Sequence, residues 1–121
     1  MSTDQTAPAG PPLSKTRRAG PLLFVSGQLP RTPEGGMCQG TIEEQTEQAI
    51  ANLRAVLQGE GLDLADVVKT TVWITRAELS AGMNAAYARL FPTPYPTRST
   101  VVSGLVAPAD VEIEAIAFDP R

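Results

Sequence analysis

Hydrophobic and polar residues follow two different periods along this chain, and each period predicts one type of element. Short apolar or alternating runs, bounded by glycine, proline or polar residues, are typical of strands. Such runs lie at residues 13–18, 22–26, 67–74, 98–102 and 111–118. The dipeptide Gly20-Pro21 favours a hairpin between the first two runs. In the third run, alternation places Val68 on the same side as Thr70 and Val72.

Two longer segments repeat with the period of a helix. Thr41 stands three residues before Glu44, which is the spacing of a capping box, so a helix is expected to begin there and to end at Gly59 and Gly61. Its apolar stripe comprises Ile50, Leu53, Val56 and Leu57. A second amphipathic helix is expected before Pro92, with its apolar positions at Leu79, Met83, Ala86, Tyr87 and Leu90.

The order of these elements predicts an α+β fold, in which two helices pack on one face of a mixed sheet. Residues 1–11 are rich in small and polar residues, which predicts a flexible tail before a single domain at 12–121. The uncovered face of the sheet is expected to be partly apolar. In the last strand, for example, Ile116 and Phe118 share a side with Glu112 and Glu114. An apolar face with carboxylates is typical of a subunit interface with a polar cleft, so we expect a homo-oligomer.

Composition excludes several classes of function. The chain has no histidine, so a histidine-based zinc site, a Ser-His pair and a Cys-His pair are all excluded. A net charge of −3 disfavours nucleic acid as a partner. No segment is typical of a membrane span or a signal peptide, so a cytoplasmic location is expected. Cys38 is the single cysteine, which excludes an intrachain disulfide, and a plain loop position is the favoured interpretation.

Arg98 stands where a proline-rich loop becomes a β-branched strand. Pro94 and Pro96 stiffen the approach, and the residues after Arg98 favour an extended backbone. A guanidinium held on rigid backbone suits the capture of a small carboxylate. An ordinary surface arginine in a weak ion pair is the other interpretation, and this segment alone favours it.

Several blocks of the chain, in one order, resemble the RidA (YjgF) family. They include Ser-Gly-Gln-Leu-Pro at 26–30, Arg-Ser at 98–99 and Glu-Ile-Glu-Ala-Ile-Ala at 112–117, with further blocks at 43–46, 52–57, 66–72 and 84–87. The resemblance runs from about Pro12 to Phe118. It implies a chorismate-mutase-like α+β fold and a homotrimer with clefts between subunits. The implied activity is hydrolysis of 2-iminobutanoate and 2-iminopropanoate to 2-oxo acids and ammonia, without a cofactor or a metal.

The resemblance also implies roles for individual residues. Arg98 matches the family arginine that clamps the substrate carboxylate, and Glu112 matches the glutamate that positions or activates water. The substrate-binding positions are Ser26, Gly27, Asn84, Thr100 and Leu13. At the last two positions this chain departs from characterised deaminases, which carry cysteine where Thr100 stands and tyrosine where Leu13 stands.

Two other functions are compatible with parts of this pattern. The same cleft could bind a 2-oxo acid or an amino acid without turnover. A ribonuclease or translation inhibitor, an activity attached to some relatives, fits poorly with a pI of about 4.9 and no cluster of basic residues.

Overall fold

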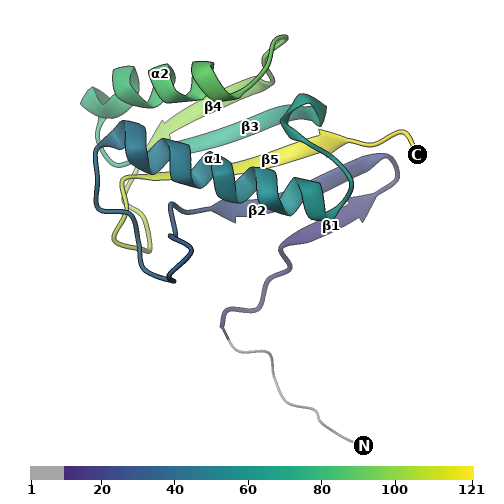
Figure 1. Ribbon diagram of the computed structural model, residues 1–121, viewed down its shortest axis with the longest axis horizontal. Coiled ribbons are helices and arrows are strands. Elements are labelled where there is room, and N and C mark those ends of the chain that lie inside the picture. Colours follow the sequence, from purple (N-terminus) through teal and green to yellow (C-terminus); the bar gives the residue numbers. More distant parts are fainter. Residues whose placement is uncertain (1–9) are drawn as a thin grey trace, which may run out of the picture.

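The computed structural model describes residues 10–121, which form a five-stranded mixed sheet with two helices on one face (Figure 1). The elements are β1 (Thr16–Ala19), β2 (Leu22–Gln28), α1 (Ile42–Gly59), β3 (Val67–Ile74), α2 (Ser80–Leu90), β4 (Thr97–Val102) and β5 (Val111–Phe118), with short 3-10 turns at Leu64–Asp66 and Ala77–Leu79. The predicted α+β fold is confirmed. Residues 1–9, most of the predicted tail, lie outside the described residues.

The sheet has the order β1-β2-β5-β3-β4. Strand β5 returns between β2 and β3 and is antiparallel to both, whereas β4 at the edge is parallel to β3. A parallel pair needs a long crossover, which α2 supplies between β3 and β4. Arg98 and Glu112 therefore lie on strands that flank β3 from opposite sides.

The predicted hairpin forms, although β1 begins at Thr16 rather than at residue 13. Gly20 has φ of 57°, in the left-handed region that a tight turn requires. Behind the hairpin, the buried carboxylate of Asp119 accepts a bond of 2.9 Å from Arg18 Nη1 and one of 2.9 Å from Arg121 Nε. These guanidinium groups hold the pKa of Asp119 well below its usual range. The hairpin is thus tied to the end of the sheet.

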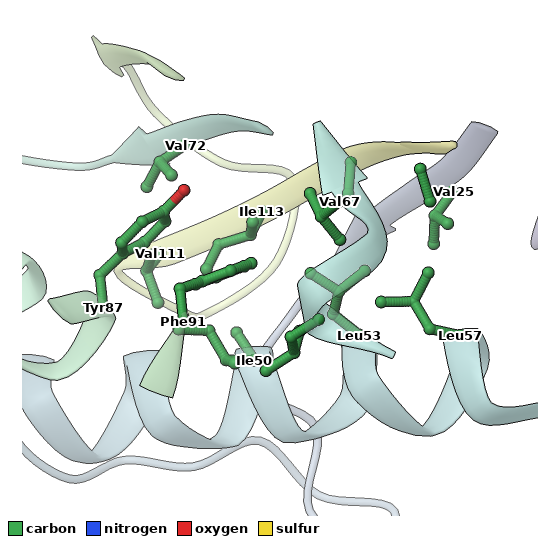
Figure 2. Close-up of a cluster of buried hydrophobic side chains, with 14 of the residues drawn as sticks. Val25, Ile50, Leu53, Leu57, Val67, Val72, Tyr87, Phe91, Val111 and Ile113 are labelled. Carbon is green, nitrogen blue, oxygen red and sulfur yellow. The ribbon is translucent and has the colours of Figure 1, made fainter. Parts of the chain in front are cut away.

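The capping box at the start of α1 is formed as predicted. Glu44 N donates to Thr41 Oγ1 at 3.2 Å, and Thr41 N donates to Glu44 Oε1 at 2.9 Å. The apolar stripe of α1 then packs on the sheet, where Leu53 and Leu57 are fully buried (Figure 2). Truncating a side chain such as Leu53 to alanine costs about 2–5 kcal/mol in a core of this kind.

Two details of the predicted pattern are wrong. The register of β3 against β5 shifts between Val67 and Lys69, so Val67 is buried and Val68 is 46% exposed instead of facing the core. In the second helix, Leu90 is 38% exposed, and Phe91 takes the buried position. Phe91 lies just past the helix in extended backbone, which turns its side chain back onto the core.

No helix covers the other face of the sheet within residues 10–121 (Figure 1). Large apolar side chains are exposed there, among them Phe24 at 41% and Phe118 at 44%. Val101 of the edge strand is 39% exposed on the same face. We refer to this surface, formed by the outward residues of β2, β5, β3 and β4, as the open face.

Candidate functional site

Arg98 lies on the helix-covered side of the sheet, beneath α2. In the parallel register it stands opposite Thr70, whose side chain is buried under the helices. The guanidinium carbon of Arg98 is 4.9 Å from the centroid of the Tyr87 ring, and its Nη1 is 3.9 Å from Met83 Sδ. Within residues 10–121, Arg98 forms no ion pair, so the surface ion pair considered above is not made there. Its charge remains available to an anion.

Tyr87 is a fixed platform for that guanidinium. Its hydroxyl points towards the sheet beside Val72 (Figure 2) and shares a hydrogen bond of 2.7 Å with Thr70 Oγ1. Its ring stacks on Phe91 with centroids 4.4 Å apart. Burial raises the pKa of Tyr87, so the neutral phenol persists at physiological pH. The electron-rich face of the ring therefore fixes the arginine without neutralising it.

A cavity of about 280 Å³ adjoins Arg98. Its lining includes Asn84 of α2 and the segment of Tyr95 and Pro96 that leads into β4. Asn84 is exposed, so its amide is accessible from this cavity. The structure thus brings Asn84 and Arg98 together. Thr100 lies two residues further along β4, on the same side as Arg98, and does not line this cavity.

Glu112 is on the open face, away from Arg98. It stands opposite Trp73 in the register of β3 and β5, between the buried residues Val111 and Ile113. The register partners of Arg98 and Glu112 on β3, Thr70 and Trp73, are three residues apart, which is about 10 Å along a strand. One chain therefore does not bring Arg98 and Glu112 to a common substrate.

Gly27 leaves the space that the Glu112 side chain occupies. The register of β2 against β5 shifts between Val25 and Gln28, and the backbone of Gly27 lies directly beside Glu112. A Cβ atom at Gly27 would overlap Glu112 Oε2 and would lie 2.9 Å from its Cδ. Desolvation by burial, and secondarily the negative charge of Glu114, raise the pKa of Glu112. The raised pKa makes the deprotonated carboxylate a stronger base than an exposed glutamate.

A cavity of about 300 Å³ surrounds this carboxylate. It is lined by Gly27, Trp73, Glu114 and the loop at 103–106. The loop presents Val106 in full exposure. Glu112, the predicted water-activating residue, thus lies in a recess of the open face that has apolar walls and a second carboxylate, Glu114.

Leu13 and Ser26 lie together at the end of β2. Ser26 N donates to Lys15 O at 2.9 Å, and Ser26 Oγ donates to Ser14 O at 2.6 Å, which ties this strand end to the segment before β1. Leu13, which is 62% exposed, lines a cavity together with Ser26 and Gly27. Gly27 also lines the Glu112 recess, so this glycine lies where the two cavities meet.

Sequence reasoning placed Tyr87 among the apolar positions of the second helix and gave Trp73 no role, so it missed the places of both beside the candidate site. Tyr87 is indeed buried, yet its ring carries Arg98. Trp73 is half-buried beside Glu112 rather than under the helices. Alternation along residues 67–74 puts Trp73 on the other side of the strand from Thr70 and Val72, and this pattern could have predicted which face Trp73 occupies. No sequence pattern indicated that Arg98 stacks on Tyr87.

Among residues 10–121, no three histidine, cysteine, aspartate or glutamate side chains are grouped in a way that could hold a metal ion. In the same residues, no helix is long and apolar enough to cross a membrane.

Comparisons with known proteins give a consistent relationship. The family model described as Endoribonuclease L-PSP matches residues 4–119. The crystal structure of RidA from the Antarctic bacterium Psychrobacter sp. PAMC 21119 has a TM-score of 0.85 and 33% sequence identity, and the match covers 97% of this chain and 96% of that chain. The chain belongs to the RidA (YjgF) family. Its predicted family is therefore confirmed.

Two further relatives in the RidA family are described in different ways, one by an activity and the other by a bound ligand. Reactive Intermediate Deaminase A, chloroplastic, from Arabidopsis thaliana is 39% identical over 97% of this chain and 64% of its own length. The crystal structure of E. coli TdcF with bound serine has a TM-score of 0.83 at 32% identity, covering 91% of this chain and 90% of that chain. The family thus includes reactive intermediate deaminases, together with proteins described as endoribonucleases.

Proposed function

We propose that the protein hydrolyses small 2-imino acids, such as 2-iminobutanoate and 2-iminopropanoate, to 2-oxo acids and ammonia without a cofactor. The observation that carries this proposal is the environment of Arg98. Its guanidinium has no carboxylate partner within residues 10–121, rests on the Tyr87 ring and adjoins a cavity with the Asn84 amide. An unpaired guanidinium, with its planar set of N–H donors, suits the carboxylate that all these substrates share.

The substrate site is proposed to form between two copies of the chain. Arg98 and Asn84 lie on the helix-covered side, whereas Glu112 and Gly27 lie on the open face. Only a neighbouring copy can bring a carboxylate clamp and a water-activating group to one ligand. The exposed aromatic residues of the open face supply the apolar area that such an association buries.

A homotrimer is the proposed assembly, in keeping with the family resemblance. Light scattering at micromolar concentration is expected to give three times the mass of one chain. A mass equal to one chain would contradict both the assembly and the shared site.

The proposed chemistry uses orientation and one general base. Arg98 holds the carboxylate so that the imine carbon faces a water beside Glu112. Water attacks the protonated form of the imine, whose nitrogen already carries two protons. Glu112 takes a proton from this water as the carbon–oxygen bond forms and returns it to the nitrogen, which then carries three. The carbon–nitrogen bond breaks while the carboxylate accepts the hydroxyl proton, which leaves the 2-oxo acid and ammonia, and Glu112 finally releases that proton to solvent. The raised pKa of Glu112 makes its carboxylate a stronger base in the two steps in which it accepts a proton.

A coupled assay tests this function. A threonine dehydratase generates the imine from threonine, and the protein is expected to accelerate the release of ammonia above the uncatalysed rate. Arg98→Ala is expected to abolish the acceleration, because the substrate carboxylate loses its clamp. Turnover by Arg98→Ala at the wild-type rate would refute the assigned role of Arg98.

A binding role is the second candidate, because the cavity beside Arg98 could hold an anion without any help from Glu112. In that case, 2-oxo acids or amino acids would raise the melting temperature, and no imine would be turned over. The bound serine in E. coli TdcF makes a small amino acid a reasonable first ligand to assay.

A further inference from the structure

The cavity that contains Leu13, Ser26 and Gly27 has an unusual charge for this chain. Its volume is about 590 Å³, compared with about 280 Å³ for the cavity beside Arg98. Lys15 and Arg31 both line it, and none of its lining residues is an aspartate or a glutamate. The chain as a whole has a net charge of −3. A local excess of positive charge in an acidic protein favours an anionic ligand.

Both cations extend from backbone that is held in place. The Asn52 side chain on α1 donates to Leu29 O at 2.9 Å and to Arg31 O at 2.9 Å, which fixes the loop after β2 against the helix. The Asn52 amide is oriented in turn by Gln48, whose Nε2 donates to its Oδ1 at 2.9 Å. On the other wall, Lys15 O accepts from Ser26 N. The wall positions are therefore set before any ligand arrives.

The positive charges of Lys15 and Arg31 are not neutralised by carboxylates within the described residues. Among residues 10–121, neither Lys15 nor Arg31 forms an ion pair with a carboxylate. Arg31 Nη1 has a single weak contact, a donated bond of 3.3 Å to Gly35 O. Between these cations the floor is apolar, with Leu29 and Val56 beside Leu13. This combination suits a short aliphatic chain that ends in an anionic group.

We propose that the preferred substrates are acidic 2-imino acids, whose side chains carry a second carboxylate that Lys15 and Arg31 bind. This inference rests on the proposed function. With the first carboxylate on Arg98 of a neighbouring copy and the imine carbon beside Glu112, the side chain enters the cavity that Gly27 shares with the Glu112 recess. A methyl or ethyl side chain has no charge for either cation to bind. Imines derived from aspartate and glutamate carry the second carboxylate that the two cations favour.

The test compares acidic and neutral imines in the same assay. Amino-acid oxidases generate the imines of aspartate, glutamate and alanine in situ, and the acceleration of hydrolysis gives kcat/KM for each. The wild-type protein is expected to favour the acidic imines. The double variant Lys15→Gln/Arg31→Gln is expected to lower the acidic-to-neutral ratio about ten- to a hundred-fold, the range expected for hydrogen bonds to a charged group.

Arg54→Gln is the control for loss of a positive charge outside the cavity, and each of the single variants Lys15→Gln and Arg31→Gln removes the same one charge inside it. Arg54 belongs to α1 but pairs with Asp63 outside the cavity, so the ratio is expected to stay at the wild-type value. Raising the ionic strength is expected to reduce the preference for acidic imines and to leave neutral turnover less affected. Thermal unfolding of each variant shows whether it is folded. The acidic-to-neutral ratio of the wild-type protein tests the substrate preference even if a variant does not fold.

The outcomes separate this inference from the proposed function. Wild-type turnover of the alanine imine at a rate equal to or above that of the acidic imines would overturn the substrate preference and leave the deaminase proposal intact. An unchanged ratio in the double variant would refute the role of Lys15 and Arg31. The absence of turnover with every imine would refute the proposed function and, with it, this inference.

Discussion

The two faces of the sheet build their parts of the candidate site in different ways. On the helix-covered side, Arg98 is held by Tyr87 and Met83, which belong to the core of the same chain. On the open face, the Glu112 side chain lies beside the backbone of Gly27, in a recess among exposed apolar residues. The comparison shows that folding alone fixes the surroundings of Arg98, whereas the recess beside Glu112 stays open within one chain. In the proposed assembly, another copy covers this recess.

The largest expected effect comes from mixing two inactive variants. Arg98→Ala and Glu112→Gln are each expected to lose more than about a hundred-fold of activity, since each removes an essential group. When both are co-expressed, about a quarter of the sites in a cyclic oligomer combine an intact Arg98 with an intact Glu112. Specific activity is therefore expected to recover to about a quarter of the wild-type value. A mixture that stays inactive would show that the two residues do not share a site across copies.

Gly27→Ala is expected to reduce kcat about ten-fold or more, because the new methyl group displaces the Glu112 carboxylate. Stability is expected to change by less than about 1 kcal/mol, since the obstructing atoms are the end of a flexible side chain. Gly59→Ala is the control, because its methyl group meets no atom within 4 Å. Steady-state kinetics and urea unfolding measure the two effects. A full loss of stability with Gly27→Ala would contradict a local displacement.

On the helix-covered side, Tyr87→Leu is expected to raise KM about ten-fold, because the cation–π contact under Arg98 is lost. Tyr87→Phe keeps the ring and loses the bond to Thr70. It is expected to keep the wild-type KM while the free energy of unfolding falls by about 1–2 kcal/mol. Equal values of KM for the two variants would show that the ring does not position Arg98.

The smallest expected effect is a shift in pH dependence. Burial and Glu114 raise the pKa of Glu112, and the deprotonated form is the active base, so activity is lost as pH falls through this raised pKa. Glu114→Gln removes the negative neighbour and lowers the pKa of Glu112. The acid limb of kcat/KM is then expected to move to lower pH by less than about one unit. Glu78→Gln, which removes an exposed carboxylate bonded to Arg76, is expected to leave the limb in place.

The elements were largely predictable because their signals are local. The capping box at Thr41 and the alternation that ends at Ile74 each depend on a few neighbouring residues. The shift of register after Val67 was not predictable, because it arises where β3 meets β5, a partner distant in the sequence. Such tertiary pairing overrides local alternation.

For the candidate site, residue types and strand parity indicated the residues, and parity placed Glu112 on the open face. The side of Arg98 relative to Glu112 depends on the order of three strands, which local patterns do not determine. The contact between Arg98 and Tyr87 likewise joins an edge strand to a helix. The assigned roles remain predictions that the variants above test.

The placement of Arg98 and Glu112 on opposite faces also has a consequence for mass action. If the proposed site forms between copies, the protein is active only in proportion to the fraction assembled, so its specific activity is expected to fall on dilution below the dissociation constant of the oligomer. Total activity then rises more steeply than the concentration of the protein. Under the proposed function, a modest rise in expression would increase imine hydrolysis disproportionately.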